Sequence, residues 1–287
     1  MGKKKILIIG GCGYIGSRLL SFFDKKDFII KILDIEMSGD PAKINNYKID
    51  YNNLSIENLS KYNYVIFLAA HSSVKSCNDD IYGAISNNII NTKKLIDKIK
   101  KISKLNLIFA SSAAIYNGST KHATEGMKNF KPNQLYDISK YYIENYIIKN
   151  IKRYYILRFS TVSGFSPNQN KDLIINKMHL DSIKEKKITI INPNTKKSIL
   201  FIDDLCRAII SIIKTNKKNT FGIYNLSSLS LKISHIAKKI ANFHKSKIIL
   251  KKGITNYSFF TSNKKFSKKY NFRFTKKIST IIESFYE

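Results

Sequence analysis

Tyr136 and Lys140 have a spacing that suits acid–base chemistry. Both lie in the run LYDISK at 135–140, whose residues are compatible with a helix. Residues four positions apart share one face of a helix, so the phenol and the ammonium can point into one pocket. A free phenol has a pKa of about 10, and a neighbouring cation favours its ionised form. Tyr136 could therefore act as a general base toward a substrate hydroxyl, although a chain this rich in tyrosine and lysine also produces such spacings by chance.

A second candidate group, the hydroxyl of Ser112, follows an apolar run that resembles a buried strand. The run 105–110 is followed by Ser111 and Ser112, and Tyr136 comes 24 residues after Ser112. That interval is long enough for one loop to return to the same place. Ser112 could then hydrogen-bond the reacting oxygen and relay its proton. The alternative interpretation is an ordinary capped strand end.

A glycine-rich turn lies near the amino terminus. The apolar run 5–9 leads into GGCGYIG at 10–16, and a helical pattern follows. Glycines allow the backbone to turn tightly and to approach a pyrophosphate, whose charge then lies against the amide groups of the helix end. Asp34 ends the next apolar run, 18 residues after Gly16. A carboxylate there accepts hydrogen bonds from an adenosine ribose and repels a ribose phosphate, so the turn predicts a site for NAD rather than NADP.

The elements that must position these groups alternate along the first half of the chain. Helical patterns at 14–23, 81–101 and 136–149 separate short apolar runs that read as strands at 5–9, 29–33, 47–49, 64–68, 105–110 and 154–158, with a late one at 223–226. Several runs are continuously apolar, which is typical of strands covered on both faces. This alternation predicts an α/β fold of the Rossmann type, with a doubly wound parallel sheet of about seven strands.

The pattern changes after about residue 159. A helix is expected at 173–184, a short strand at 188–191 and a further helix at 203–213. We therefore expect a dinucleotide-binding domain at 1–162 and a smaller, interleaved substrate lobe at 163–287, with about 203–226 returning to the first domain. Asp181, Asp203 and Asp204 are assigned to helix ends and surface charge.

Composition narrows the class of protein. Hydrophobic residues make up 43% of the 287 residues, and no segment is apolar for long enough to be a secretory signal or a membrane span. The three cysteines form no C-x-x-C pair, which argues against a disulfide framework or a zinc site and suits a cytoplasmic location. The net charge of +30 could indicate nucleic-acid binding. Its lysines are spread along the whole chain, however, so compositional drift is favoured, and the basic surface would attract anionic substrates.

Taken in order, these motifs resemble the extended short-chain dehydrogenases/reductases, in particular the nucleotide-sugar epimerase/dehydratase group, over almost the full length. The matching positions are 10–16, Asp34, Asp50, 68–71, Asn88 with Thr92, 111–112 with Tyr116, Tyr136 with Lys140, 157–158, Gly164, 201–205 and 222–225. The resemblance implies a nucleoside diphosphate sugar as substrate. It also implies a homodimer that pairs helices 81–101 and 136–149.

The resemblance further assigns residues to roles. Catalysis would rest on Ser112, Tyr136 and Lys140. NAD would be held by Gly10, Gly13, Tyr14, Ile15, Gly16, Asp34, Asp50, Leu68, Ala69, Ala70, Asn88, Tyr136 and Lys140. The substrate would be contacted by His71, Ser111, Asn176 and Lys197, the last in place of a phosphate-binding arginine. His179 is a further candidate for a general acid, although a lone helical histidine more often has no such role.

Ala113 and Ala114 depart from the family's pattern. Members that catalyse a 4,6-dehydration carry an acidic pair at these positions, and decarboxylating members usually carry a glutamate at the second, so both reactions are disfavoured. The leading hypothesis is an NAD-dependent nucleotide-sugar epimerase that oxidises a ring hydroxyl transiently to a keto sugar. A net dehydrogenase or reductase acting on a similar substrate is the enzymatic alternative. A basic RNA-binding protein on the same scaffold is the alternative from another class.

Overall fold

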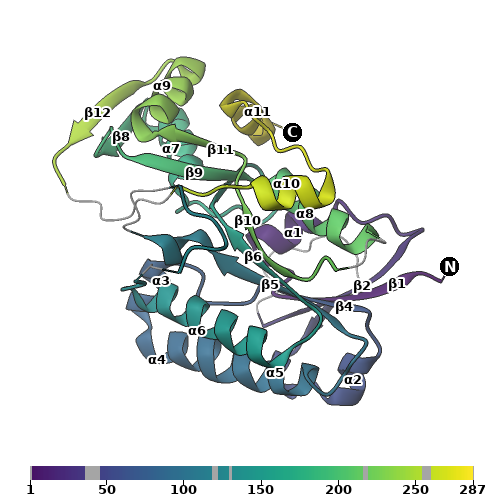
Figure 1. The fold of residues 1–287 in the computed structure, drawn as a ribbon. Coiled ribbons are helices and arrows are strands. Elements are labelled where there is room, and N and C mark those ends of the chain that lie inside the picture. The colour runs from purple at the N-terminus through teal and green to yellow at the C-terminus, as the bar shows by residue number, and fades with distance from the viewer. Residues whose placement is uncertain are drawn as a thin grey trace.

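The computed structural model describes residues 2–35, 46–117, 122–128, 131–215, 219–253 and 260–286 (Figure 1). Its centre is a parallel sheet of seven strands in the order β10-β6-β5-β4-β1-β2-β3. The strands are β1 (Lys4–Ile9), β2 (Phe28–Asp34), β3 (Asn46–Lys48), β4 (Tyr64–Phe67), β5 (Asn106–Ser112), β6 (Tyr154–Phe159) and β10 (Gly222–Leu226). The predicted Rossmann-type sheet is confirmed.

Apolar side chains on both faces hold this sheet between two layers of helices. Successive residues of a strand point to opposite faces, so Ile6 and Ile8 join one buried cluster while Leu7 and Ile9 join the other. Helices α1 (Tyr14–Leu20) and α8 (Ile202–Lys214) cover the first face, and α5 (Thr92–Ile99) and α6 (Leu135–Asn150) cover the second. Double coverage explains why the strands are continuously apolar.

The helix predicted at 81–101 is built from three pieces. It begins as α4 (Ile81–Ile85), continues as a π-helical segment η2 (Ser86–Asn91) and ends as α5. π-Helical segments are rare and often occur near functional sites. The short elements η1 (Tyr51–Asn53), α2 (Ile56–Ser60), α3 (Val74–Asp79) and η3 (Ala113–Tyr116) complete this part of the chain.

The remaining elements form a smaller layer above the sheet in Figure 1. It contains a three-stranded sheet of β11 (Leu229–Lys232), β9 (Lys196–Phe201) and β7 (Thr161–Ser163), and a two-stranded sheet of β12 (Lys247–Lys251) and β8 (Lys187–Ile191). Its helices are α7 (Ile174–Lys184), α9 (Ile233–His244), α10 (Lys264–Tyr270), α11 (Ile278–Glu283) and η4 (Ser284–Tyr286). Between β9 and β11 the chain returns to the large sheet, where it forms α8 and β10.

Two aspartates at the start of α8 differ in environment. Asp203 pairs with Arg18 of α1, with a shortest distance of 2.7 Å. Asp204 is fully buried, where it accepts hydrogen bonds from Ser228 Oγ at 2.5 Å and from the backbone N of Thr275 at 2.7 Å. Surface charge was therefore the wrong assignment for Asp204, because the third residue of α8 faces the interior.

Within the described part of the chain, every helix is too short or too polar to span a membrane. The three cysteines are buried and form no disulfide.

Candidate active site

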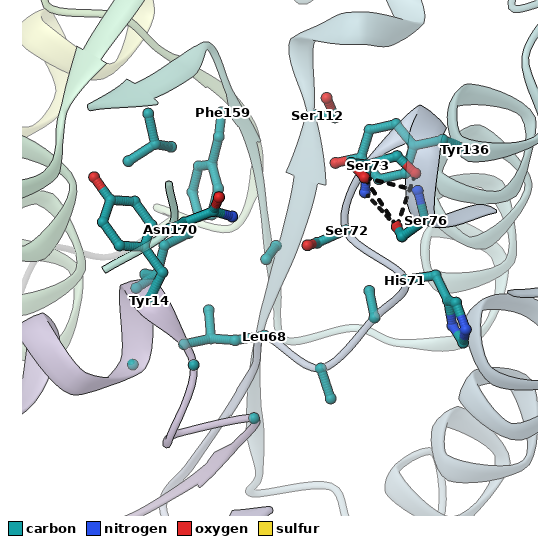
Figure 2. Close-up of a pocket in the computed structure, with 18 of the residues that line it drawn as sticks. Tyr14, Leu68, His71, Ser72, Ser73, Ser76, Ser112, Tyr136, Phe159 and Asn170 are labelled. Atoms are coloured by element: carbon teal, nitrogen blue, oxygen red, sulfur yellow. Dashed lines mark hydrogen bonds between the residues drawn. The ribbon is translucent and has the colours of Figure 1, made fainter. Parts of the chain in front are cut away.

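A cavity of about 740 Å³ opens at the carboxyl ends of β1, β4 and β5 (Figure 2). Strand order reverses between β1 and β4, and ligands bind to open α/β sheets at such a reversal. The wall is formed by the glycine-rich turn after β1, the loop after β4, the end of β5 and the first turns of α6. The rest of the wall includes Thr161, Val162, Asn170, Asp172, Leu173 and Lys197.

The glycine-rich turn is shaped by a close approach of two backbone segments. Gly10 has a φ of +81°, and a Cβ at this position would lie 2.6 Å from the backbone N of Ala69. Asp34, at the end of β2, accepts a hydrogen bond from the backbone N of Cys12 at 2.9 Å and borders the cavity together with Gly13. The turn and Asp34 thus form a cradle that fits the pyrophosphate and adenosine ribose of NAD.

Most residues predicted to contact NAD border this cavity, namely Gly10, Gly13, Tyr14, Ile15, Gly16, Asp34, Leu68, Ala69, Ala70, Tyr136 and Lys140. Asp50 does not border the cavity, and its carboxylate caps η1 by accepting from the backbone N of Asn52 at 2.8 Å. Asn88, in the π-helical segment, is buried behind the wall. Its Oδ1 accepts from the backbone N of His71 at 2.8 Å and its Nδ2 donates to the carbonyl of His71 at 3.1 Å, so Asn88 holds the loop that lines the cavity.

Ser112, Tyr136 and Lys140 come together at one end of the cavity. Ser112 ends β5, while Tyr136 and Lys140 are one turn apart at the start of α6. Figure 2 shows the ring of Tyr136 beside Ser112. The Nζ of Lys140 donates to the carbonyl of Ala110 at 2.9 Å, which fixes the ammonium against β5.

Burial shifts the pKa of Tyr136 and that of Lys140 in the direction that favours the neutral form of each side chain. It raises the pKa of Tyr136 to about 12, and a hydrogen bond with Ser112 acts in the opposite direction. Burial lowers the pKa of Lys140 to about 8, against the attraction of Cys77 and Glu144. The sequence predicted that Lys140 would favour the phenolate, but burial is the larger effect on the pKa of Tyr136. A positive charge placed beside the phenol by a bound ligand would act toward ionisation.

A buried ion pair that the sequence analysis missed lies beneath these residues. Glu144, on α6, receives the guanidinium of Arg158 from β6, with Nη2 to Oε2 at 2.5 Å and Nε to Oε1 at 3.0 Å. Ser111 donates to the same carboxylate at 2.5 Å, and Arg158 also contacts the hydroxyl of Tyr116. Glu144 follows Tyr136 by eight residues and Lys140 by four, so helical spacing could have placed it on the same face of α6.

Of the four residues predicted to contact the substrate, three border the cavity and one does not. His71, Ser111 and Lys197 border the cavity. The Nε2 of His71 lies 3.3 Å from Oδ2 of Asp80, and burial lowers the pKa of Lys197 to about 8. Asn176 is fully buried outside the wall, and its amide is bonded to Ser163, Gly164 and Asn170.

His179 lies in an aromatic cluster apart from the cavity wall. Its ring stacks on Phe285 with centroids 4.1 Å apart, and its Nδ1 lies 3.1 Å from Nε2 of His244. Burial lowers the pKa of His179 to about 4. His179 is not among the described residues that border the cavity.

Known proteins are similar to this chain in sequence and in fold. The family model described as NAD dependent epimerase/dehydratase family matches residues 6–227. The dTDP-D-glucose 4,6-dehydratase of Dictyostelium discoideum is 28% identical to this chain. The match covers 83% of this chain and 62% of the length of that protein. The UDP-glucose 4-epimerase of Mycoplasma genitalium is 26% identical over 86% of this chain and 84% of the relative. The crystal structure of UDP-glucuronic acid 4-epimerase from Bacillus cereus, in complex with UDP-glucuronic acid and NAD, superposes with a TM-score of 0.86 at 21% identity, covering 98% of this chain and 97% of the other.

Proposed function

Because the chain belongs to the NAD-dependent epimerase/dehydratase family, and is thus an NAD-dependent enzyme, we propose that it is a nucleotide-sugar epimerase. The observation that carries the proposal is the convergence of Ser112, Tyr136 and Lys140 on a cavity that also contains the glycine-rich turn. Ala113 and Ala114 favour epimerisation over dehydration, because neither position offers an acid or a base. A net dehydrogenase or reductase would use the same residues, and the experiment below distinguishes it from an epimerase.

The proposed cycle begins with a proton transfer at Tyr136. NAD, when bound, supplies the acceptor for a hydride from the sugar carbon and afterwards its donor. The Oη of Tyr136, once ionised, would take the proton of the ring hydroxyl, and Ser112 would hydrogen-bond the same oxygen. The keto sugar then turns in the cavity, and Tyr136 returns the proton to its oxygen. Protein and cofactor end the cycle unchanged.

Binding of the nucleoside diphosphate sugar is assigned to the wall opposite the glycine-rich turn. Lys197 enters this wall from β9 as a buried cation, and a buried ammonium is suited to the charge of a diphosphate. His71 and Ser111 are proposed to lie near the sugar. In this scheme residues 1–162 bind mainly NAD and residues 163–287 mainly the substrate, with about 203–226 returning to the large sheet.

A homodimer is part of the proposal. The side chains of Ile81, Tyr82, Ile138 and Tyr142 on α4 and α6 are apolar or aromatic and exposed, Tyr82 by 89%. An exposed apolar surface of this kind is typical of an interface between proteins. Light scattering at micromolar concentration should give twice the chain mass, and a Tyr82→Lys/Ile138→Lys variant should give a monomer. A monomeric parent would contradict this part of the proposal.

The test of the reaction uses a panel of UDP-, GDP-, dTDP- and CDP-sugars, with and without added NAD. An epimerase forms the isomeric sugar nucleotide with no net NADH, and Tyr136→Phe should lower turnover by about 10²–10⁴-fold. Tyr286→Phe, a control at an exposed tyrosine outside the cavity wall, should leave turnover unchanged. Stoichiometric NADH would show a dehydrogenase instead. Salt-sensitive RNA binding that survives Tyr136→Phe, without turnover on the panel, would favour the RNA-binding alternative.

A further inference from the structure

A second cavity lies beside α8, and its lining differs from that of the catalytic cavity. Its volume is about 460 Å³, which is within the range of small-molecule sites. It is formed by Arg207 and Ser211 of α8, by Phe22, which follows α1, and by residues 270–273 at the end of α10. None of the described residues that line it also borders the cavity of Tyr136. A ligand held here would therefore be bound at a separate site.

The end of α10 determines which side chains face this second cavity. Asn271 ends the helix in the left-handed conformation, with a φ of +50°, so the chain changes direction there. Phe272 and Phe274 are buried and pack together with ring centroids 4.6 Å apart, whereas Arg273 between them is exposed. Alternate residues of this segment thus face opposite sides, which places the side chain of Arg273 outside the aromatic core.

The guanidinium of Arg207 is held in position by its neighbours. Its Nη2 donates to the buried carboxylate of Asp204 and, at 3.3 Å, to the carbonyl of Arg273. Its Cζ lies 5.0 Å from the centroid of the Phe272 ring. Among the described residues, none accepts a hydrogen bond from Nε or Nη1 of Arg207, and none pairs with the guanidinium of Arg273. Because the Arg207 side chain is 45% exposed, its remaining donors are accessible to a ligand.

The lining of the second cavity combines positive charge with aromatic surface. The described residues that line it include two arginines and no acidic residue. Asp204 balances the charge of Arg207 from the protein interior, so the charge of Arg273 is left for a ligand. Guanidinium groups bind phosphate oxygens through parallel pairs of hydrogen bonds. Phe22 and Tyr270 contribute ring surface beside the arginines, and such surface suits a planar or apolar group.

We propose that the second cavity binds a phosphate monoester that carries an aromatic ring. Arg207 and Arg273 hold the phosphate, and Phe22 and Tyr270 contact the ring. A monoester is preferred to a diester, because its second negative charge gives each guanidinium an oxyanion to pair with. The site lies outside the proposed epimerase reaction and does not depend on it.

The experiment is a calorimetric titration with phenyl phosphate, with inorganic phosphate as the second probe. An ionic strength of about 0.15 M screens the general attraction of a basic chain for anions. The parent is compared with Arg273→Ala and with Arg207→Lys, which keeps a cation beside Asp204 but removes the planar fork. Lys239→Ala, which removes an exposed charge from α9, is the control for net charge. Lys197→Ala reports whether the probe binds in the catalytic cavity instead.

Phenyl phosphate should bind saturably to the parent and more tightly than inorganic phosphate. Arg273→Ala should raise the dissociation constant about ten- to a hundredfold, because a charge-assisted hydrogen bond is lost. Arg207→Lys should raise it about three- to tenfold, whereas Lys239→Ala and Lys197→Ala should match the parent.

Three results would overturn the inference. They are the absence of saturable binding, an unchanged dissociation constant in both arginine variants, and binding that is lost in Lys197→Ala alone. Circular dichroism verifies that each variant is folded, and if Arg207→Lys does not fold, Arg273→Ala decides the question. Because no sugar nucleotide is used, failure of the epimerase assay leaves this result unaffected.

Discussion

Replacing Glu144 by glutamine should destabilise the fold far more than the loss of a typical ion pair. The carboxylate is 1% exposed and the guanidinium of Arg158 is 3% exposed. Two nitrogens of Arg158 and the hydroxyl of Ser111 all donate to Glu144. Glu144→Gln keeps the shape but leaves a buried arginine without its counter-charge. Breaking a buried pair in this way costs about 3–5 kcal/mol of the free energy of unfolding.

The assay is urea unfolding followed by circular dichroism, with a surface pair as control. Lys177 and Asp181 on α7 form an i,i+4 pair at 3.1 Å, and the lysine side chain is 61% exposed. Asp181→Asn should change the free energy of unfolding by about 0.5 kcal/mol or less, because exposed pairs contribute little. A Glu144→Leu/Arg158→Met double variant should be less destabilised than the sum of its single variants, because no charge is left buried. If Glu144→Gln lies within about 1 kcal/mol of the parent, the ion pair does not stabilise the fold as argued.

Three further predictions concern individual side chains. Asp34→Asn should raise the Kd for NAD about tenfold or more and reduce the preference over NADP, measured by titration of NAD-free protein. Burial lowers the pKa of Lys197 to about 8, so the KM for the sugar nucleotide should rise as pH increases through 8 and the ammonium loses its proton; Lys197→Arg should flatten this rise. Burial lowers the pKa of His179 to about 4, below its unfolded value of about 6.5. The unfolded chain then binds the extra proton as pH falls below 6.5, so stability should decrease toward pH 4 by on the order of 3 kcal/mol, and His179→Phe should remove most of this loss in acid-dependent urea unfolding.

The large sheet could be predicted because its strands leave a strong pattern. Strands such as β1 are buried on both faces, so the sequence shows continuous apolar runs bounded by turns. The strands of the smaller sheets leave a weaker pattern in the sequence. β12 is mostly exposed and begins and ends with lysine, so its sequence resembles a loop. The π-helical segment was also not predicted, because its residues do not distinguish a π-helical turn from an α-helical one.

The candidate site could be predicted as far as its backbone positions, and less well in the direction of its side chains. Tyr136 and Lys140 share a face of α6 because of their spacing, and Ser112 reaches them because neighbouring parallel strands end at one edge of the sheet. Asn88 and Asn176 were predicted to contact ligands, whereas in the structure both amides are buried outside the cavity wall and hold loops. An amide can serve a ligand or a backbone equally well, and sequence does not distinguish the two.

The chemistry of the wall beside Ser112 gives the strongest reason to prefer epimerisation over dehydration. An elimination needs an acid for the leaving hydroxyl and a base for the neighbouring carbon. Ala113 and Ala114 follow Ser112 directly, are buried, and pack in an apolar cluster with Ile115 and Tyr116. Neither can supply a proton. His71 also borders the cavity, and its Nε2 lies 3.3 Å from Oδ2 of Asp80. A dehydratase would have to bring its acid from another part of the chain, whereas an epimerase needs only the proton that Tyr136 takes and returns.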